Sequence, residues 1–341
     1  MPNPPTVVVT GANGYLGSHI VKQLLEKDYT VHACVRNASN ESSVRHLLQL
    51  PSAADNLKLF STGDLGDASV KGRYDEPLKG CHAIIHSATP LSPKLSGKEF
   101  DGERDVLRPG MNGTRELLDS IVKCENRMSI HCLVLTSSMS AAAPSPEPAV
   151  KDESHWSDDV AQLSRGNFYG CLKTRQEKLC HQWIKQQAAT LATNFRFVAI
   201  CPTMIIGPPV GSDQEGFSYT PSGTMGVFHH WLTGGKPSAP NDSMSFIDVR
   251  DCANMHIASM EKADASGRYF SLVESWHWND ILNTLKELYP GIPPFTLYEG
   301  NKIIPTRFNL QRMNSLGVKP KGIRTILKDS ISFFKDIGTL K

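Results

Sequence analysis

The first two hundred residues alternate short apolar runs with longer amphipathic segments. The apolar runs are rich in β-branched residues and lie at 6–10, 30–35, 57–61, 83–86, 130–136 and 195–201. The amphipathic segments lie at 15–27, 42–50, 106–124 and 168–187. This alternation predicts βαβ units, and nearly continuous apolar runs indicate strands that helices cover on both faces. We therefore expect an α/β fold with a Rossmann-type doubly wound parallel sheet.

The pattern changes after Pro202, where Pro and Gly residues recur at short intervals and break the chain into loops and short helices. We expect a smaller C-terminal substrate lobe that is interleaved with the end of the sheet. The predicted division is a cofactor-binding domain at 1–200 and a region at 201–341 that is mainly substrate lobe, with some segments returning to the first domain. The loops expected to line the substrate pocket lie near 91–105, 141–165 and 208–240.

A glycine-rich turn follows the first predicted strand and opens the first predicted helix. Gly11 allows a sharp turn off the strand, Gly14 lets the backbone approach a pyrophosphate, and Gly17 lets the helix pack closely on the sheet. The helix N-terminus favours the negative charge of such a ligand. Glycines also mark plain turns, but the strand–turn–helix context favours dinucleotide binding. The residues assigned to it are Gly11, Asn13, Gly14, Tyr15, Leu16 and Gly17.

The end of the second predicted strand discriminates between NAD and NADP. A carboxylate at this point would bind the ribose 2′-hydroxyl and repel a 2′-phosphate. The sequence instead has Arg36, whose guanidinium can stack on adenine and pair with that phosphate. Asn37, Ser39 and Asn40 add hydrogen-bond donors. We therefore predict NADP(H) as the cofactor; the alternative is that Arg36 is a solvated loop charge.

Two serines and a Tyr–Lys pair are the candidate catalytic groups. The run 130–136 ends at Ser137 and Ser138, at the sheet edge where parallel strands bind ligands. Tyr169 and Lys173 lie four residues apart near the start of a predicted helix, and hence on one face. The ammonium would lower the pKa of Tyr169 and make it a usable acid. A serine hydroxyl would stabilise the substrate oxygen as it gains charge, and both serines remain candidates from the residues alone.

Composition narrows the partners and the compartment. The chain has 36 Lys and Arg against 34 Asp and Glu, and the net charge of +2 gives no electrostatic case for nucleic acid or an anionic membrane. No apolar run approaches the roughly 18 to 20 residues that span a bilayer, and the N-terminus leaves no room for a signal peptide. The scattered cysteines fit a reducing compartment. We expect a cytoplasmic monomer or homodimer whose partner is a small-molecule carbonyl substrate.

Ordered motifs run along nearly the whole chain. They include VTGANGYLGSHIVKQLL at 9–25, GDLGD at 63–67, GCHAIIHSATP at 80–90, TSSMS at 136–140, NFYGCLKTRQEK at 167–178 and FIDVRDCANMHIASME at 246–261. With the GxxGxxG spacing, they make the chain resemble the extended short-chain dehydrogenases/reductases, and in particular the dihydroflavonol reductase and cinnamoyl-CoA reductase group. The resemblance implies NADPH-dependent reduction of an aldehyde or ketone, reversible with the alcohol.

The resemblance also assigns individual residues. It aligns Ser138, rather than Ser137, with the catalytic serine, and it implies that Lys173 hydrogen-bonds the nicotinamide ribose. It places the remaining cofactor contacts near the adenine (Asp64, Leu65), along the cofactor channel (Ala88, Thr89) and beside the nicotinamide (Pro202, Thr203, Met204, with Tyr169 and Lys173). If the resemblance is set aside, the sequence alone predicts that Asp64 and Leu65 form a turn after a strand and that Pro202 ends a strand.

Departures from the family pattern concern the substrate. Leu172 precedes Lys173, where relatives often have Ser, and the KNWYCYGK signature of plant cinnamoyl-CoA reductases is absent. Ala143 stands five residues after Ser138, where dihydroflavonol reductases commonly carry Asn or Asp that contacts the flavonoid. The reductase chemistry therefore follows from the resemblance, whereas these two plant substrates do not.

Other histidines and aromatic residues have ordinary explanations. His229, His230 and the Trp-His-Trp cluster at 276–278 lack a nearby carboxylate or Cys to complete a metal set, so we predict surface or packing roles and no metal. His86 is expected to be a hydrogen-bonded structural residue rather than a base. The functional alternatives are a steroid- or sugar-nucleotide-type dehydrogenase and a regulator that binds NADP(H) without turnover. Such regulators usually lose the Tyr or the Lys, and this chain has both.

Overall fold

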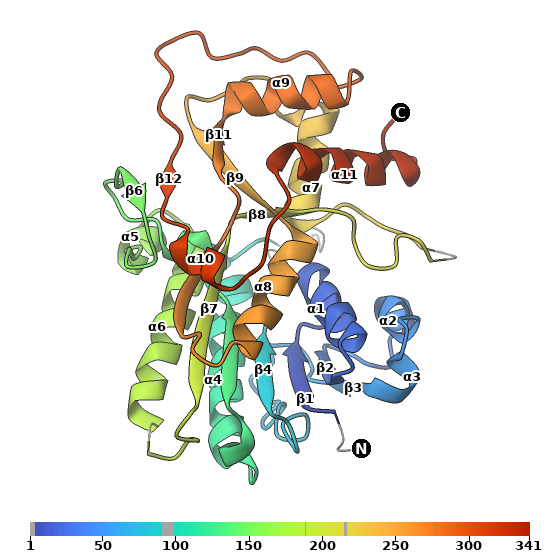
Figure 1. The fold of residues 1–341 in the computed structure, drawn as a ribbon, viewed down its shortest axis with the longest axis vertical. Helices are drawn as coiled ribbons and strands as arrows, with labels where there is room; N and C mark the ends of the chain where they lie inside the picture. Colours follow the sequence, from blue (N-terminus) through green and yellow to red (C-terminus); the bar gives the residue numbers. More distant parts are fainter. Residues whose placement is uncertain (1–3, 91–98, 188, 215–216) are drawn as a thin grey trace.

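The computed structural model describes residues 4–90, 99–187, 189–214 and 217–341. Within these ranges a seven-stranded sheet has the order β10-β7-β5-β4-β1-β2-β3, and every neighbouring pair is parallel (Figure 1). Its strands are β1 (Thr6–Thr10), β2 (Thr30–Val35), β3 (Leu57–Ser61), β4 (Ala83–His86), β5 (Cys132–Thr136), β7 (Arg196–Pro202) and β10 (Gly267–Ser271). The predicted Rossmann-type parallel sheet is confirmed, and the strands up to β7 agree with the predicted runs to within two residues.

Helices cover both faces of this sheet. One face packs against α1 (Tyr15–Glu26), α2 (Glu41–Leu48) and α8 (Val249–Glu261), and the other against α4 (Arg108–Lys123) and α6 (Phe168–Gln187). Side chains alternate between the two faces along a strand, so Val7 and Val9 of β1 join the first core and Val8 joins the second. This two-sided burial explains why the strand sequences are apolar at nearly every position.

The helix expected at 106–124 begins differently from the prediction. A π-helical turn spans Glu103–Leu107, and regular α-helix starts at Arg108 as α4. Pro109 lies in the first turn of α4, where its missing N–H and fixed φ are tolerated. The shorter helices of the first two hundred residues are α3 (Ala53–Asn56) and α5 (Asp159–Ser164).

The C-terminal lobe is more regular than the predicted loops and short helices. In the described chain it has a small sheet in the order β11-β9-β8, formed by β8 (Met204–Ile206), β9 (Ser243–Asp248) and β11 (Ser275–His277). Its helices are α7 (Gly223–His230), α9 (Trp278–Leu288) and α11 (Ile323–Asp336), around an aromatic-rich core. The prediction was too coarse because Pro and Gly cluster in the connecting loops and are absent from the sequences of α9 and α11.

Segments after residue 201 also contribute to the main sheet. Strand β10 adds to its edge beside β7, and α8 packs on the sheet face beside α1 (Figure 1). A short parallel pair joins β6 (Val150–Lys151) to β12 (Arg307–Phe308), and α10 (Gln311–Ser315) follows β12. The two lobes are therefore interleaved along the chain. No described helix is long and apolar enough to cross a membrane.

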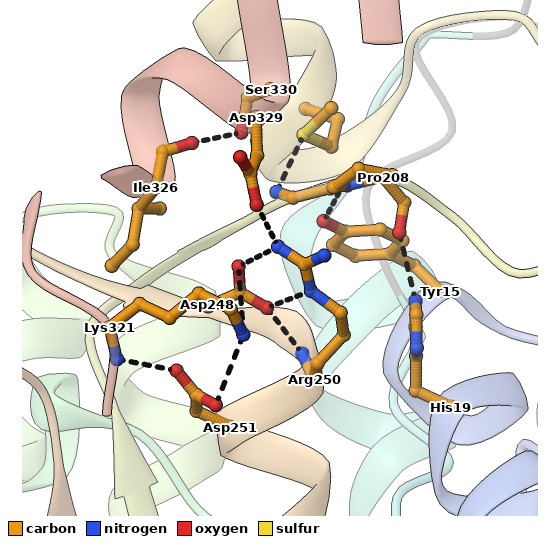
Figure 2. A network of polar contacts seen from close by, with 12 residues as sticks. Tyr15, His19, Pro208, Asp248, Arg250, Asp251, Lys321, Ile326, Asp329 and Ser330 are labelled. Carbon is orange, nitrogen blue, oxygen red and sulfur yellow. Dashed lines mark hydrogen bonds and ion pairs between the residues drawn. The ribbon is translucent and has the colours of Figure 1, made fainter. Parts of the chain in front are cut away.

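The first helix is tied to the segment that leaves β8, as Figure 2 shows. The hydroxyl of Tyr15 donates to the carbonyl oxygen of Gly207 at 2.6 Å. The ring of His19 donates from Nε2 to the carbonyl oxygen of Pro208 at 3.0 Å. These bonds hold the start of the 208–240 segment against the helix that follows the glycine turn.

An ion-pair network continues this junction into the C-terminal helix (Figure 2). Asp248 begins α8 and accepts a hydrogen bond from the backbone N–H of Arg250 at 2.8 Å. The guanidinium of Arg250 bonds Asp248 and also Asp329 on α11. Nearby, the backbone N–H of Lys321 donates to Asp251 at 2.8 Å. The network thus joins the start of α8 to Lys321, which lies just before α11, and to Asp329 within α11.

Candidate active site

A large pocket opens at the carboxyl edge of the main sheet and continues toward the C-terminal lobe. Its volume is about 2430 Å³, well above the roughly 300–1,000 Å³ of ordinary small-molecule sites, so it has room for a dinucleotide and a second molecule. It lies where the strand order reverses between β1 and β4, the usual ligand position in such sheets. The glycine turn, Arg36, Ser138, Tyr169, Lys173 and the other cofactor contacts that the resemblance assigns all line this pocket, whereas Ser137 and Ser39 do not.

The glycine turn has the geometry that a pyrophosphate site needs. Gly11 has φ of +64°, and a Cβ atom there would lie 2.9 Å from the Cα of Ala88. A Cβ atom on Gly17 would lie 2.1 Å from the carbonyl oxygen of Gly11. Among the described residues no side chain caps α1 at Gly14, and the first turn of α1 holds no acid. The N–H groups of that turn are therefore available to an anion, and the residues fit a dinucleotide.

Arg36, which the sequence predicts to select NADP(H), forms an exposed ion pair with Asp64. Arg36 Nε lies 3.6 Å from a carboxylate oxygen of Asp64, at the adjacent ends of β2 and β3. The side chains are 76% and 59% exposed, so the pair itself adds little stability. The guanidinium thus remains free to engage a phosphate at this end of the pocket. Asn13 is used differently, because its side chain donates to the carbonyl oxygen of Ser43 at 3.1 Å and braces the turn against α2.

Arg73 organises the loop that carries Asp64 and Leu65, a role that the sequence analysis missed. Its side chain is 2% exposed. The guanidinium donates to the carbonyl oxygens of Thr62, Asp64, Asp67 and Val70 at 2.9 to 3.0 Å. Arg73 follows the GDLGD motif by only six residues, and this proximity is the one signal in the sequence. An arginine that organises a loop cannot otherwise be distinguished in sequence from a solvent-exposed arginine.

The predicted catalytic residues come together at the centre of the pocket. Ser138 and Tyr169 both line the pocket, close enough for the Ser138 side chain to lower the pKa of Tyr169. The ammonium of Lys173 lies 5.8 Å from the centre of the Tyr169 ring, one helical turn away on α6. It donates to Thr89 Oγ1 at 2.6 Å and to the carbonyl oxygen of Thr136 at 2.8 Å. These bonds anchor Lys173 to the segment after β4 and to the end of β5, and the third ammonium N–H has no hydrogen-bond partner among the residues that the structure describes.

The pKa shifts at this site differ in cause from the prediction. Burial raises the pKa of Tyr169, whose ring is 37% exposed toward the pocket that it lines, and the hydrogen bond with Ser138 lowers it. The predicted lowering by Lys173 is therefore not the effect found; Ser138 provides the opposing contribution. Burial lowers the pKa of Lys173 to about 7, against smaller opposite effects from Cys201 and Glu177. An anion bound beside Lys173 would restore its charged form.

The two candidate serines point to different surroundings. The hydroxyl of Ser137 donates to a carboxylate oxygen of Glu177 at 2.6 Å and is buried. Ser138 lines the pocket with Tyr169 and accepts from the N–H of Ser140 at 3.1 Å. The geometry favours Ser138 as the group that faces a substrate.

His86 is a structural histidine, as expected. Its Nδ1 lies 2.7 Å from Thr10 Oγ1 and its Nε2 lies 3.1 Å from Thr114 Oγ1. Burial lowers its pKa to about 3, so the ring is neutral. Thr10 Oγ1 also accepts from the N–H of Ala88, and the histidine thereby helps to fix the cofactor channel. On the opposite wall, the buried hydroxyl of Thr203 has no hydrogen-bond partner among the described residues and is available to a ligand.

The substrate side of the pocket is only partly where the sequence placed it. Segments within 141–165 and 208–240 line it, including Ala143, whereas residues 91–98 lie outside the described chain. The sequence analysis missed the segments 242–245 and 303–308. The consecutive Ile303 and Ile304 are exposed there, and this apolar pair beside a proline could have signalled a pocket wall.

The predicted packing roles are mostly observed. His229 packs on Phe334, and Trp231 packs on Trp278, with ring centres 4.9 and 4.8 Å apart. His230 differs, because it lines the pocket. The described residues contain no group of three or more His, Cys, Asp or Glu that could hold a metal ion. The eight cysteines, all within the described ranges, are free and buried.

Comparison with known proteins identifies the family. Residues 7–272 match the model of the NAD dependent epimerase/dehydratase family. The chain belongs to this family. It is 31% identical to a bifunctional dihydroflavonol 4-reductase/flavanone 4-reductase of Malus domestica, over 93% of this chain and 86% of that protein. A cinnamoyl-CoA reductase of Medicago truncatula is 29% identical, over 97% of this chain and 95% of that protein.

Solved structures share the fold. A yeast methylglyoxal/isovaleraldehyde reductase complexed with NADPH superposes with a TM-score of 0.81 at 23% identity, covering 98% of this chain and all of that chain. Vestitone reductase from alfalfa has a TM-score of 0.76 at 24% identity, covering 98% and 99%. The predicted membership of the extended short-chain dehydrogenases/reductases is confirmed, and this family member is an oxidoreductase that uses a nicotinamide cofactor.

Proposed function

We propose that this protein reduces an aldehyde or ketone to the alcohol with NADPH. The observation that carries the proposal is the cluster of Ser138, Tyr169 and Lys173, with the Lys173 ammonium 5.8 Å from the centre of the Tyr169 ring, in a pocket that also contains the glycine turn. A proton donor, an oxygen-stabilising donor and a dinucleotide site thus open into one space. The same groups would serve the reverse oxidation of the alcohol.

Each group has a distinct task in the proposed reaction. NADPH, when bound, supplies a hydride that forms the new C–H bond at the carbonyl carbon. Tyr169 gives its hydroxyl proton to the carbonyl oxygen, which takes up the electron pair of the C=O bond. Ser138 donates a hydrogen bond to that oxygen as its charge develops. The ammonium of Lys173 stabilises the tyrosinate that remains.

The cofactor would be held at both ends of the pocket. The N–H groups at the start of α1 would bind the pyrophosphate, and Arg36 would pair with the 2′-phosphate. Lys173 and the unpartnered hydroxyl of Thr203 would face the nicotinamide end. The names of the relatives, reductases of carbonyl compounds, and the NADPH in the yeast structure support this proposal.

The test is NADPH consumption across a panel of aldehydes and ketones. We expect smaller aryl or aliphatic carbonyls to be reduced, and Tyr169→Phe to abolish the reaction while the protein still binds NADPH. A wild-type protein that consumes no NADPH with any member of the panel would contradict the proposal. So would a Tyr169→Phe variant that works as well as the wild type.

A further inference from the structure

Helix α6 extends the line of catalytic side chains by one more turn. Glu177 follows Tyr169 and Lys173 at successive intervals of four residues, so the three share one face of α6. The Glu177 carboxylate is fully buried. It bonds the guanidinium of Arg268, whose side chain is 4% exposed on β10 at the edge of the sheet. Neither member of this ion pair lines the pocket or belongs to the residues assigned to the reaction.

The ion pair grips the chain on both sides of Ser138. The second carboxylate oxygen of Glu177 accepts from the Ser137 hydroxyl at 2.6 Å. Arg268 donates to the carbonyl oxygen of Ala141, three residues beyond Ser138, at 2.9 Å. It also donates to the carbonyl oxygen of His155. Its guanidinium stacks 3.4 Å above the ring of Trp156, which fixes its orientation.

The extended backbone at Ser138 links these contacts to the direction of the Ser138 side chain. Ser138 is extended, with φ of −162° and ψ of 155°. In an extended chain neighbouring side chains point to opposite sides, so Ser137 faces the ion pair while Ser138 faces the pocket. A bond that holds the Ser137 hydroxyl therefore sets the direction of the Ser138 hydroxyl.

Stability alone is a weak explanation for this arrangement. Burying a carboxylate and a guanidinium costs desolvation energy that their attraction often fails to repay, and apolar residues of similar size can serve as well. A buried pair is of value where a fixed geometry is required. Its hydrogen bonds here converge on the segment from Ser137 to Ala141, which carries Ser138.

We propose that Glu177 and Arg268 are positioning residues, which hold Ser137 and Ala141 and so aim the Ser138 hydroxyl at the substrate oxygen. This inference rests on the proposed reductase function. It goes beyond it in assigning a kinetic role to residues that touch neither substrate nor cofactor.

The test uses Glu177→Gln and Ser137→Ala in the full-length protein. Glu177→Gln removes the charge that holds Arg268, and Ser137→Ala removes the hydroxyl bond and leaves the ion pair intact. We expect kcat to fall about tenfold or more in Glu177→Gln and by a smaller factor in Ser137→Ala, because the misplaced donor is one worth roughly 10²- to 10³-fold. The Kd of NADPH should change less than about twofold in both. Glu287→Gln, which breaks the exposed pair between Glu287 and Arg324, is the matched control and should behave as wild type.

A second set of variants separates positioning from loss of structure. If Glu177 acts through Ser138, adding Glu177→Gln to Ser138→Ala should lower kcat little further, since the oriented group is already gone. Glu177 also lies near Lys173, but Ser137→Ala retains that charge, so a loss of kcat in this variant cannot arise through Lys173. Thermal unfolding of each variant identifies the temperatures at which it is folded.

The outcomes are distinct. Wild-type kcat in both Glu177→Gln and Ser137→Ala overturns the positioning role and leaves the reductase function standing. Losses that multiply in the Ser138→Ala background overturn it as well, because they show a route other than Ser138. If Glu177→Gln does not fold, Ser137→Ala alone and combined with Ser138→Ala decides the question. A wild-type protein without reductase activity overturns the proposed function, and the positioning role with it.

Discussion

Tyr169 and Lys173 share one face of α6 but have different surroundings. We therefore expect different kinetic defects when each of them is replaced. Tyr169 lines the pocket together with Ser138, so Tyr169→Phe should remove the acid and keep a ring of nearly the same shape. Proton donation is typically worth about 10²- to 10⁴-fold, and kcat should fall by that factor while the Kd of NADPH hardly changes. Retention of more than about a tenth of wild-type turnover would rule out Tyr169 as the principal acid.

Lys173→Met should impair both turnover and cofactor binding. The ammonium is anchored to Thr89 and Thr136 beside the cofactor channel, and its pKa of about 7 would rise when an anionic cofactor binds. Fluorescence titration with NADPH, beside steady-state kinetics, measures the two effects. Wild-type NADPH affinity in Lys173→Met would show that the lysine serves the chemistry and not the cofactor.

Arg36 predicts the choice between the two nicotinamide cofactors. Its exposed guanidinium lies at the end of β2, where NAD-selective folds place a carboxylate. We expect NADPH to bind at least about tenfold more tightly than NADH, which is about 1.4 kcal/mol. Arg36→Asp should narrow or invert this preference without affecting kcat at saturating cofactor. Equal affinities of the unmodified protein for both cofactors would refute this role.

At the scale of helices and strands, the sequence predicts elements well where burial is uniform. Strands β1, β4, β5 and β7 are apolar because both faces are covered, and their pattern is visible over four or more consecutive residues, whereas the edge strand β3 has exposed positions at Lys58 and Ser61. Strands β8 and β11 have three residues each, too few to show a period, and were missed; the longer β9 and β10 were missed as well, in the region expected to form loops and short helices. The π-helical turn before α4 was missed as well, since its residues look like helix.

The candidate site likewise contains residues that the sequence predicts and residues that it does not. The glycine turn and the Tyr–Lys pair are short-range motifs, so spacing alone locates them. Arg73 and the pair Glu177–Arg268 act through the fold: Arg268 meets a carboxylate 91 positions earlier in the chain. A single sequence carries no signal of such a contact, and the charges resemble those of an ordinary surface.

Arg73 tests whether the loop after β3 must be held in place for cofactor binding. Arg73→Met removes the donors that bind the carbonyl oxygens of Thr62, Asp64, Asp67 and Val70. We expect NADPH affinity to fall about tenfold and the melting temperature to drop by several degrees, since buried carbonyl groups lose their partners. Lys71→Met is the matched control, because Lys71 also pairs with Glu116 but is exposed. Unchanged affinity in Arg73→Met would show that the loop does not depend on it.

The wall segment after Ser138 bears on the substrate. Ala143 lines the pocket and carries no polar side chain, and Ser157 Oγ bonds both its N–H and its carbonyl oxygen. The wall therefore offers no hydrogen-bonding group at the position where flavonoid reductases place one, and dihydroflavonols should be poor substrates. Ala143→Asn should improve their turnover relative to that of simple aldehydes. A kcat/KM for dihydroquercetin above that for simple aldehydes in the unmodified protein would show this inference to be mistaken.

At the scale of the whole molecule, three buried histidines make hydrogen bonds at the lobe junction, beneath the predicted cofactor channel and between α8 and the sheet. His19 bonds Pro208 at the lobe junction, His86 bonds Thr10 beneath the cofactor channel, and His256 on α8 lies 2.9 Å from Thr136 Oγ1. Burial lowers their pKa values from 6.5 to about 4, 3 and 4. All are neutral in the folded protein at pH 7, and in His86 and His256 both ring nitrogens already have hydrogen-bond partners.

This arrangement predicts acid lability with a definite sign. Below pH 6.5 the unfolded chain protonates these histidines while the folded protein does not, so folding stability falls as the pH falls, until the folded state also binds protons near pH 4. Each histidine contributes about 1.4 kcal/mol per pH unit within this window. Denaturant titrations between pH 6.5 and 4.5 measure the slope. His256→Gln, which keeps a neutral hydrogen-bonding side chain, should reduce the slope by the contribution of one proton, about 1.4 kcal/mol per pH unit. If the free energy of unfolding stayed constant or rose as the pH was lowered from 6.5 to 4.5, these rings would have to be protonated in the folded protein.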